Sequence, residues 1–463
     1  MLPNKRLSKL VTLTVLALVW TRVSRAEVEL VKAAGWTVTT DGRANGFVSH
    51  IWGDDRPDGF ESLAWMAFNE APDTGQADEN GKLQKTRIRS GYVPSTLAFN
   101  LRKELYKDWL NVAARAEIGF QIANMEPVTP SDTTWMQPRA VYLDLSGVWG
   151  SLRAGRDLSL FPRSNLLMNY ELGHAYGVGF PCSYYFVFGG ACGHVGFGTL
   201  WPDFRAQITY STPNFGDVFQ VSVGMFDPRT VPTINWTRTP LPRFEGEAVA
   251  KHYFSDDWGF KAWANGAFQQ IGIGYDILDP MTGLAVGRED ATASAYGAGG
   301  GLQGYLGPVK AGVSGYMGRG MDAFVFLGFN PINFSRDSAV PNQDRKLRPT
   351  RGFLAEASVT VGSTWVMGGF GKAFLDRMPS DVPIEPRGPE DINQPPLQRT
   401  QTGISAGVFH RIEQVVFGVD YFNARYGFDP RFVDDNTADM VPGEFVDSAQ
   451  TVNVLNAGVT LEW

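Results

Sequence analysis

The sequence predicts an all-β fold, a transmembrane antiparallel β-barrel of 16 strands, and three observations lead to it. The chain ends in a segment of alternating apolar and polar residues that stops at Trp463, which is the pattern of a strand between two environments. It begins with a leader typical of exported proteins. Between these ends, pairs of strand-like segments with tight turns alternate with long irregular segments.

Residues 1–26 form the predicted signal peptide. Lys5, Arg6 and Lys9 make a basic start, residues 10–20 are apolar, and Ala26 offers a small residue for cleavage. A transmembrane helix is the alternative, but this run is shorter than the ~20 apolar residues that a spanning helix needs. The mature chain would then comprise residues 27–463, a single barrel domain.

Composition favours a barrel and argues against nucleic acid as a partner. The leader removes five basic residues and no acidic ones, so the formal charge falls from −7 to −12, whereas phosphate binding needs a basic surface. The 52 Gly, 13 Trp, 15 Tyr and 31 Phe suit twisted strands with aromatic girdles. Mean hydropathy is only −0.16, as expected when lipid meets every second residue of a strand.

Seven predicted hairpins carry turn-forming residues at their tips. They pair residues 87–104 with 110–122, 139–145 with 150–157, 203–210 with 218–226, 243–254 with 259–271, 293–306 with 309–318, 351–361 with 364–374, and 399–411 with 415–426. Residues 36–52 and 451–463 add one strand at each end. An even count lets the first strand pair with the last and leaves no open edge. A soluble β-sandwich is the alternative, but the sequence has no linker or change of composition between domains.

The segment 110–122 illustrates the two predicted faces. Val112, Ala114 and Ile118 lie on one face, whereas Arg115 and Glu117 lie on the other. An Arg on the lipid face at mid-bilayer costs ~2–4 kcal/mol. The charged face is therefore expected to line a polar, water-filled lumen.

The longest connection, residues 157–202, is expected to be a constriction loop. Its part from 172 to 202 has eight glycines and no Asp, Glu, Lys or Arg. The glycines and Pro181 exclude a membrane helix, and an exposed loop would be more polar. We expect this third long loop to fold into the lumen. A lid or an oligomer contact outside the barrel is the alternative.

Cys182 and Cys192 are the two cysteines of the chain. Export to an oxidising compartment favours a disulfide between them. His174 and His194 flank the pair, so a metal site must be considered, but the spacing matches none of the common short zinc ligand pairs. No metal or cofactor is therefore expected.

Residues 139–156 and 203–210 resemble the strands that lead into and out of the inward-folded third loop of general diffusion porins of the Gram-negative outer membrane. Trp463 resembles the terminal aromatic residue of that family. The resemblance implies a sixteen-stranded barrel, typically a homotrimer, embedded in outer-membrane lipid. It also implies passive diffusion of small hydrophilic solutes and ions.

The resemblance further implies an eyelet in which basic wall residues face acidic loop residues. Arg139 and Arg205 occupy the matching wall positions. Inward-facing positions on the predicted strands add further arginines, and the loop supplies two carboxylates. The predicted pore-constriction residues are therefore Arg115, Arg139, Arg153, Arg205, Arg43, Asp157 and Glu171. Arg139 shares a face with Val141 and Leu143, so a β-bulge is needed to turn it inward.

No enzyme is expected. Phosphate loops, dinucleotide fingerprints and nucleophile elbows are missing from the sequence, and no nucleophile, base and orienting acid stand out by spacing. Two alternatives to a general pore stay open. One is a substrate-selective channel, for example for carbohydrates that stack on the aromatic residues of the loop. The other is a structural or adhesive anchor.

Overall fold

The computed structural model describes residues 27–54, 82–122, 135–184, 187–228, 236–239, 241–278, 285–323, 325–326, 346–378, 398–428, 431–433, 444–446 and 449–463. The predicted signal peptide lies outside these residues. Among them, no helix combines the length and the apolar character that crossing a membrane requires.

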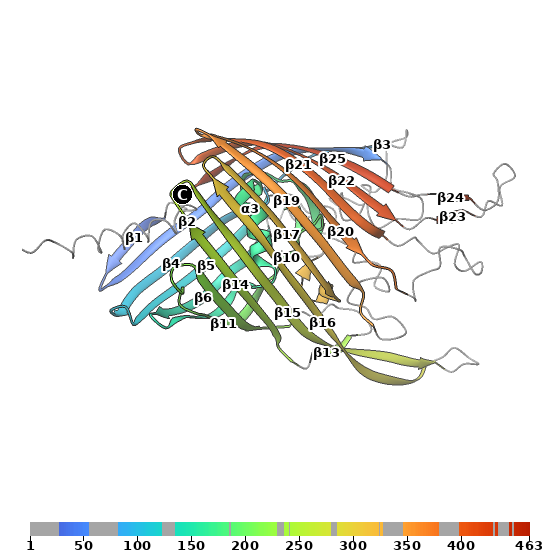
Figure 1. Ribbon diagram of the computed structural model, residues 1–463, viewed down its shortest axis with the longest axis horizontal. Coiled ribbons are helices and arrows are strands. Elements are labelled where there is room, and N and C mark those ends of the chain that lie inside the picture. The colour runs from blue at the N-terminus through green and yellow to red at the C-terminus, as the bar shows by residue number, and fades with distance from the viewer. Residues whose placement is uncertain are drawn as a thin grey trace, which may run out of the picture.

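Sixteen antiparallel strands form a closed barrel, as predicted (Figure 1). In ring order they are β2 (Trp36–Asp54), β4 (Ser95–Tyr106), β5 (Leu110–Gln121), β6 (Trp135–Gly147), β7 (Gly150–Leu158), β11 (Phe204–Ser211), β12 (Phe219–Phe226), β14 (Arg243–Tyr253), β15 (Trp258–Leu278), β16 (Ala285–Leu306), β17 (Val309–Arg319), β19 (Pro349–Val361), β20 (Thr364–Leu375), β21 (Gln398–Ile412), β22 (Val415–Phe428) and β25 (Ala449–Glu462). The pairing of β2 with β25 from Arg43 to Gly53 closes the ring.

The structure also contains short strands and helices outside these sixteen barrel strands. They are β1 (Val28–Ala33), β3 (Lys82–Arg89), α3 (Arg163–Leu172), η2 (His174–Tyr176), β8 (Phe180–Tyr184), β9 (Val187–Gly193), β10 (Trp201–Pro202), β13 (Trp236–Arg238), η3 (Met321–Ala323), β18 (Val325–Phe326), β23 (Arg431–Val433) and β24 (Glu444–Val446). Most of them lie in the connections between barrel strands. None of these smaller elements was predicted from the sequence, apart from the end of β3, which lies within the strand predicted at 87–104.

The single strand expected at 87–104 is wrong, because β3 and β4 are separate strands that both pair with β2. The chain between them is buried and leaves the ladder. The amide of Gly91 donates to Asn45 Oδ1 at 2.8 Å, and the amide of Tyr92 donates to Gly177 O at 2.8 Å. Pro94 has no amide hydrogen with which to continue the ladder.

Two other predicted boundaries move. The strand predicted at 139–145 continues to Gly147, which pairs with Gly150, so the tight turn of this hairpin consists of Val148 and Trp149. The strands β15 and β16 are 21 and 22 residues long, whereas a strand of ~9–11 residues spans a bilayer. Their ladder runs without interruption almost to the Leu278–Ala285 pair. This hairpin therefore extends well beyond the rest of the barrel.

The two faces of each strand differ as predicted. On β5, Ile118 is 41% exposed and its neighbour Glu117 only 7%. Large apolar side chains such as Val313, Phe353 and Val459 are exposed on the outside. A lipid-facing exterior explains this pattern, because a barrel needs an apolar outer band.

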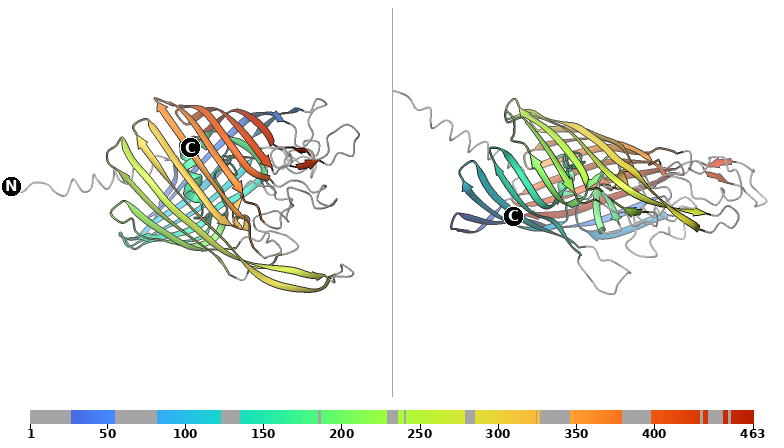
Figure 2. Two further views of the ribbon diagram at one scale, coloured as in Figure 1. Left: turned by 45° about the vertical axis from the view of Figure 1, so that its right-hand side comes forward. Right: turned by 90° about the horizontal axis from the view of Figure 1, so that it is seen from below.

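Short turns gather at one end of the barrel, where the C-terminus lies (Figure 2). Glycines with positive φ stand at two of the tight turns, Gly307 at 54° and Gly362 at 59°, a conformation that side-chain-bearing residues disfavour. At the same end, Trp463 and Gly42 exchange two backbone hydrogen bonds of 2.9 and 3.1 Å. In barrels of this kind the short turns lie in the periplasm.

Candidate functional site

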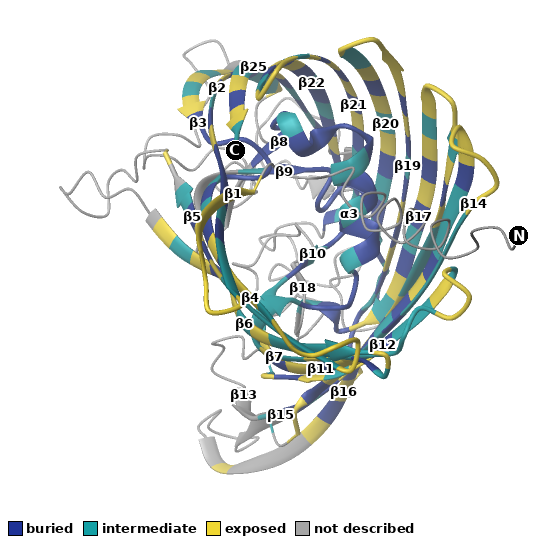
Figure 3. Cartoon of the chain, turned by 90° about the vertical axis from the view of Figure 1, so that its left-hand side faces the viewer, coloured by how far each residue is buried: buried dark blue, intermediate teal, exposed yellow. Residues whose placement is uncertain are grey.

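The segment between β7 and β11 lies along the inner side of the wall. Figure 3 shows α3, β8 and β9 within the ring of strands. The helix α3 lies against β16, β17 and β19, and β8 lies against β22. The tip of the segment, β9, approaches β3 and β5.

Wall carboxylates hold the first part of this segment. Glu245 accepts a hydrogen bond from the amide of Phe161 at 2.9 Å. Glu247 accepts hydrogen bonds from the amide and hydroxyl of Ser164 at 3.2 and 2.7 Å and forms an ion pair with Arg163. These wall residues supply partners to buried backbone groups that would otherwise be unsatisfied, at a cost of ~1–3 kcal/mol each.

A second set of contacts holds the middle of the segment. Asn169 Nδ2 donates to Glu356 Oε1 at 2.7 Å. Asp420 accepts the amides of Val178 and Gly179 at 3.0 and 2.8 Å. Since both amides are buried, one wall carboxylate fixes two consecutive peptide groups of the loop.

Two histidines are buried in the same region. The rings of His174 and His194 lie edge to face with centroids 5.4 Å apart, and His194 Nε2 lies 2.8 Å from Ser405 Oγ. Burial, together with the neighbouring His174, holds the pKa of His194 well below its usual value of 6.5. His194 is therefore neutral at pH 7.

The described residues between 172 and 202 are almost all buried, which explains why the segment carries no charge. Cys192 is disulfide-bonded, and Cys182 is the other cysteine of the chain. The side chain of Cys182 lies outside the described residues, but its backbone pairs with Gly190 in the β8–β9 hairpin. The two cysteine positions therefore lie on facing strands.

The inner face of β2, β4, β5 and β6 carries a cluster of paired charges. Arg115 donates to Asp41 Oδ2 at 2.7 Å and to Glu117 Oε2 at 2.6 Å. Arg139 donates from Nε to the other oxygen of Glu117 at 3.1 Å. The ladder between β5 and β6 shifts register between Ala140 and Pro138, which confirms the bulge expected at Arg139.

A second cluster follows on β6, β7 and β11. Arg153 forms an ion pair with Asp144 at 2.6 Å and another with Asp157, and its guanidinium lies 4.1 Å from the centre of the Tyr142 ring. Arg205 pairs with Asp203 at 3.2 Å and lies opposite Asp157 in the β7–β11 ladder. The structure thus brings Arg153, Asp157 and Arg205 together.

Arg43 and Glu171 lie apart from these clusters. Arg43 is fully buried, forms an ion pair with Glu462 and donates to Ala175 O at 2.7 Å. Glu171 lies 3.5 Å from Lys261 and 3.2 Å from Gln303, on strands β15 and β16. The other predicted carboxylate, Asp157, belongs to the wall strand β7. Neither Asp157 nor Glu171 therefore faces the wall arginines from an opposing loop.

Three further residues of the lining were not predicted from the sequence. Asp41, Asp144 and Tyr142 lie on inward faces of their strands, and alternation would have placed them there. The face of α3 that is only partly buried holds Arg163, Leu167, Tyr170 and Glu171, whose spacing of four, three and one residues fits one helical face. That periodicity was the available signal for the helix.

Among the described residues, no group of three or more His, Cys, Asp or Glu side chains is placed to hold a metal ion.

The chain matches one protein family over most of its length. The family model, described as Gram-negative porin, covers residues 12–429. Among solved structures, the outer membrane channel DcaP of Acinetobacter baumannii is similar with a TM-score of 0.55 at 14% identity, over 93% of this chain and 99% of that chain. The anion-selective porin from Comamonas acidovorans gives 0.52 at 14% identity, over 92% and 100%. No curated protein matches the chain.

Proposed function

This chain belongs to the Gram-negative porin family and is an outer-membrane channel, and from that premise we propose that small hydrophilic solutes and ions diffuse through it passively between the inward segment and the wall of β4–β7 and β11. Members of the family are channels rather than enzymes. The location of the loop contacts carries this proposal. They fall mainly on β14–β22, β25 and β2, whereas the arginines of the charged clusters lie on β5, β6, β7 and β11.

The balance of charge in this lining supports a weakly selective pore. Arg115 and Arg139 share Glu117, and Arg153 and Arg205 each have a carboxylate partner. Because cations and anions alternate along one wall, their fields largely cancel for a solute a few ångströms away. The predicted residues Arg115, Arg139, Arg153, Arg205 and Asp157 therefore belong to this lining, whereas Arg43 and Glu171 are assigned to fixing the loop.

The inward segment 157–202 is proposed as the constriction, with a Cys182–Cys192 disulfide that stiffens its tip. Closing a loop by a disulfide restricts the conformations of the free chain. The mature protein is proposed to comprise residues 27–463, after cleavage of the leader near Ala26. It is proposed to assemble as a homotrimer in outer-membrane lipid, as the family resemblance implies.

Single-channel recording in planar bilayers tests the proposed function. We expect a current that is linear in voltage, does not saturate with salt, and shows a reversal potential close to zero in a salt gradient. Block by micromolar sugar would indicate a substrate-selective channel instead. A barrel that inserts but does not conduct would contradict the channel and favour a structural anchor.

A further inference from the structure

The outer face of the barrel carries a group of cations near the end opposite the short turns. Arg319 on β17, Arg351 on β19, Lys372 on β20 and Arg425 on β22 occupy outward positions. Arg351 continues the face of the exposed Phe353, and Lys372 continues that of the exposed Phe370. These four residues are called the rim cations below.

Strand register places the rim cations close together. Arg351 pairs with Phe374, and Lys372 pairs with Phe353, so the two cations are diagonal neighbours, ~7–8 Å apart. Both approach one ring, since Arg351 Cζ lies 5.5 Å and Lys372 Nζ 5.1 Å from the centroid of Phe374. Arg319 pairs with Pro349 and is therefore diagonal to Arg351 on its other side.

The depth of the rim cations matches the outer membrane surface. Arg351 lies ten residues from the periplasmic end of β19 at Val361, and Lys372 lies eight residues from the start of β20 at Thr364. A tilted strand of ~9–11 residues crosses the hydrocarbon layer. The rim cations therefore lie at the level of the lipid headgroups of the outer leaflet.

Within the described part of the chain, one carboxylate forms an ion pair with these cations. Asp376 lies 3.5 Å from Arg351, whose side chain is still 58% exposed. Among the described residues, Lys372 contacts the Phe374 ring and forms no ion pair. Long basic side chains at this depth extend toward the polar headgroups. Each can contribute ~1 kcal/mol of attraction to an anionic lipid surface.

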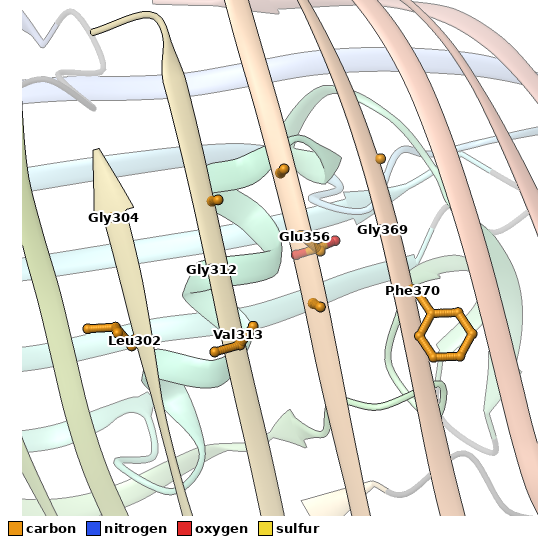
Figure 4. A pocket seen from close by; sticks show the side chains of 11 residues that line it. Leu302, Gly304, Gly312, Val313, Glu356, Gly369 and Phe370 are labelled. Carbon is orange, nitrogen blue, oxygen red and sulfur yellow. The ribbon is translucent and has the colours of Figure 1, made fainter. Parts of the chain in front are cut away.

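An apolar groove lies on the same outer face, nearer the membrane centre. It has a volume of about 570 Å³ and is lined by β16, β17, β19 and β20. Its outward residues are small in the middle, at Ala311, Ala355, Ala357 and Gly368, and larger at the edges. Figure 4 shows Leu302, Val313 and Phe370 on these strands, with α3 behind them. The groove adjoins the rim cations, because its lining residue Phe370 lies two residues before Lys372 on the same face of β20. Ala355, opposite Phe370, lies two residues from Phe353, which pairs with Lys372.

We propose that the rim cations and this groove together form a binding site for a phosphorylated lipid of the outer leaflet, with its phosphate at Arg351, Lys372 and Arg319 and an acyl chain in the groove. Charge complementarity selects an anionic headgroup, and the depth of the cations selects the outer leaflet. The groove would otherwise be a gap in the packing of hydrocarbon against the barrel. A lipid that fills it gains contacts that neither feature provides alone.

Native mass spectrometry of the detergent-solubilised protein tests the proposal, with phosphorylated lipid A, its dephosphorylated form and phosphatidylethanolamine as probes. The wild-type protein should prefer phosphorylated lipid A. Arg351→Gln with Lys372→Gln should weaken that binding by about tenfold or more, since two charge contacts are lost. Asp376→Asn should strengthen it.

Three further variants separate the two parts of the site. Arg156→Gln, which removes an outward-facing cation on β7, is the matched control and should bind like the wild type. Ala357→Leu and Gly368→Leu should fill the groove and weaken both lipid A forms equally. The cavity around Gly368 accepts a side chain, since Ser405 O at 3.7 Å is the nearest atom to an added Cβ. All of these positions face outward, and folding is checked by gel mobility without heating.

The proposal is overturned if the wild-type protein does not discriminate between the two lipid A forms, or if the double Gln variant keeps its preference. Unchanged binding by the groove variants would overturn the acyl-chain part of the site. Displacement of the bound lipid by inorganic phosphate alone would identify an anion site and not a lipid site. Each result is independent of whether the channel conducts.

Discussion

At the scale of single residues, the arginines of the pore lining are defined by their partners. Arg153 is held between Asp144 and Asp157. Arg153→Gln therefore leaves two carboxylates without a counter-charge. One such charge ~5 Å from an ion in water is worth roughly 0.8 kcal/mol, about a factor of four in local cation concentration. We expect the reversal potential in a salt gradient to shift toward cations.

Arg205→Ala should shift the reversal potential in the same direction, since it removes a positive charge from the same lining and the ion pair with Asp203. Arg43→Gln is the contrasting variant. Arg43 is buried against Glu462 and the inward segment, so its loss should raise current noise more than it changes selectivity. A larger selectivity change in Arg43→Gln than in Arg153→Gln would contradict the assigned pore path.

His194 gives the loop a dependence on pH. Its folded-state pKa lies below the usual 6.5, so the unfolded segment binds a proton more readily than the docked one. Docking is therefore fully stable above pH 6.5 and weakens as pH falls toward the folded pKa. Open-channel noise should rise on acidification, and His194→Gln should flatten that rise. His410→Gln, at an exposed position outside the loop, should leave it unchanged.

At the scale of elements, the inward segment depends on a few wall residues. Asp420→Ala leaves the buried amides of Val178 and Gly179 without an acceptor, at a cost of about 1–3 kcal/mol for each amide. The segment should become mobile, and single-channel recordings should show larger noise and brief conductance steps. Asp257→Ala, at an exposed turn, is the control. Identical traces for wild type and Asp420→Ala would show that other contacts suffice.

The hairpin β8–β9 carries the two cysteine positions. Replacing both Cys182 and Cys192 by Ser should remove the proposed covalent restraint and increase current noise, while the barrel stays folded. A reducing agent should produce the same noise in the wild-type channel. The stiffening role is excluded if neither treatment alters noise or conductance.

Alternation alone predicted most strands of the barrel, because a strand between lipid and water must change polarity at every residue. It failed where the environment has no such division. Residues 90–94 face the inward segment instead of water, so the strand predicted there is interrupted. The helix α3 has wall on one side and lumen on the other. Its 3.6-residue period was missed because the segment 157–202 was interpreted from its composition and not from its periodicity.

The candidate site was harder to predict than the fold. The alternation of inward and outward positions correctly predicted that Arg115 and Arg153 face the lumen, and the expected β-bulge turns Arg139 inward. The partner of each arginine depends on the register between strands far apart in sequence, as Asp41 with Arg115 shows. No local pattern contains that register, so the expectation that Glu171 would face the arginines came from resemblance and was not met.

At the scale of the whole molecule, stability depends on the seam between β2 and β25. A Cβ atom on Gly42 would lie 2.5 Å from the Trp463 ring and 2.6 Å from Thr96 O, whereas one on Gly46 would meet only Ile122 at 3.5 Å. Gly42→Ala should therefore cost about 1–3 kcal/mol through overpacking, and Gly46→Ala much less. The temperature at which the folded gel band converts to the unfolded one measures both. Equal temperatures would mean that the seam tolerates the extra atom.

The hairpin of β15 and β16 has a practical consequence. At ~3.3 Å per residue, about ten residues of each strand project past the membrane and reach ~30 Å from its surface. A short epitope inserted between Leu278 and Ala285 would be displayed on this projecting hairpin, away from the ion path. Whole cells could then be stained with an antibody, and the copy number of the protein counted, while the currents through it are recorded undisturbed.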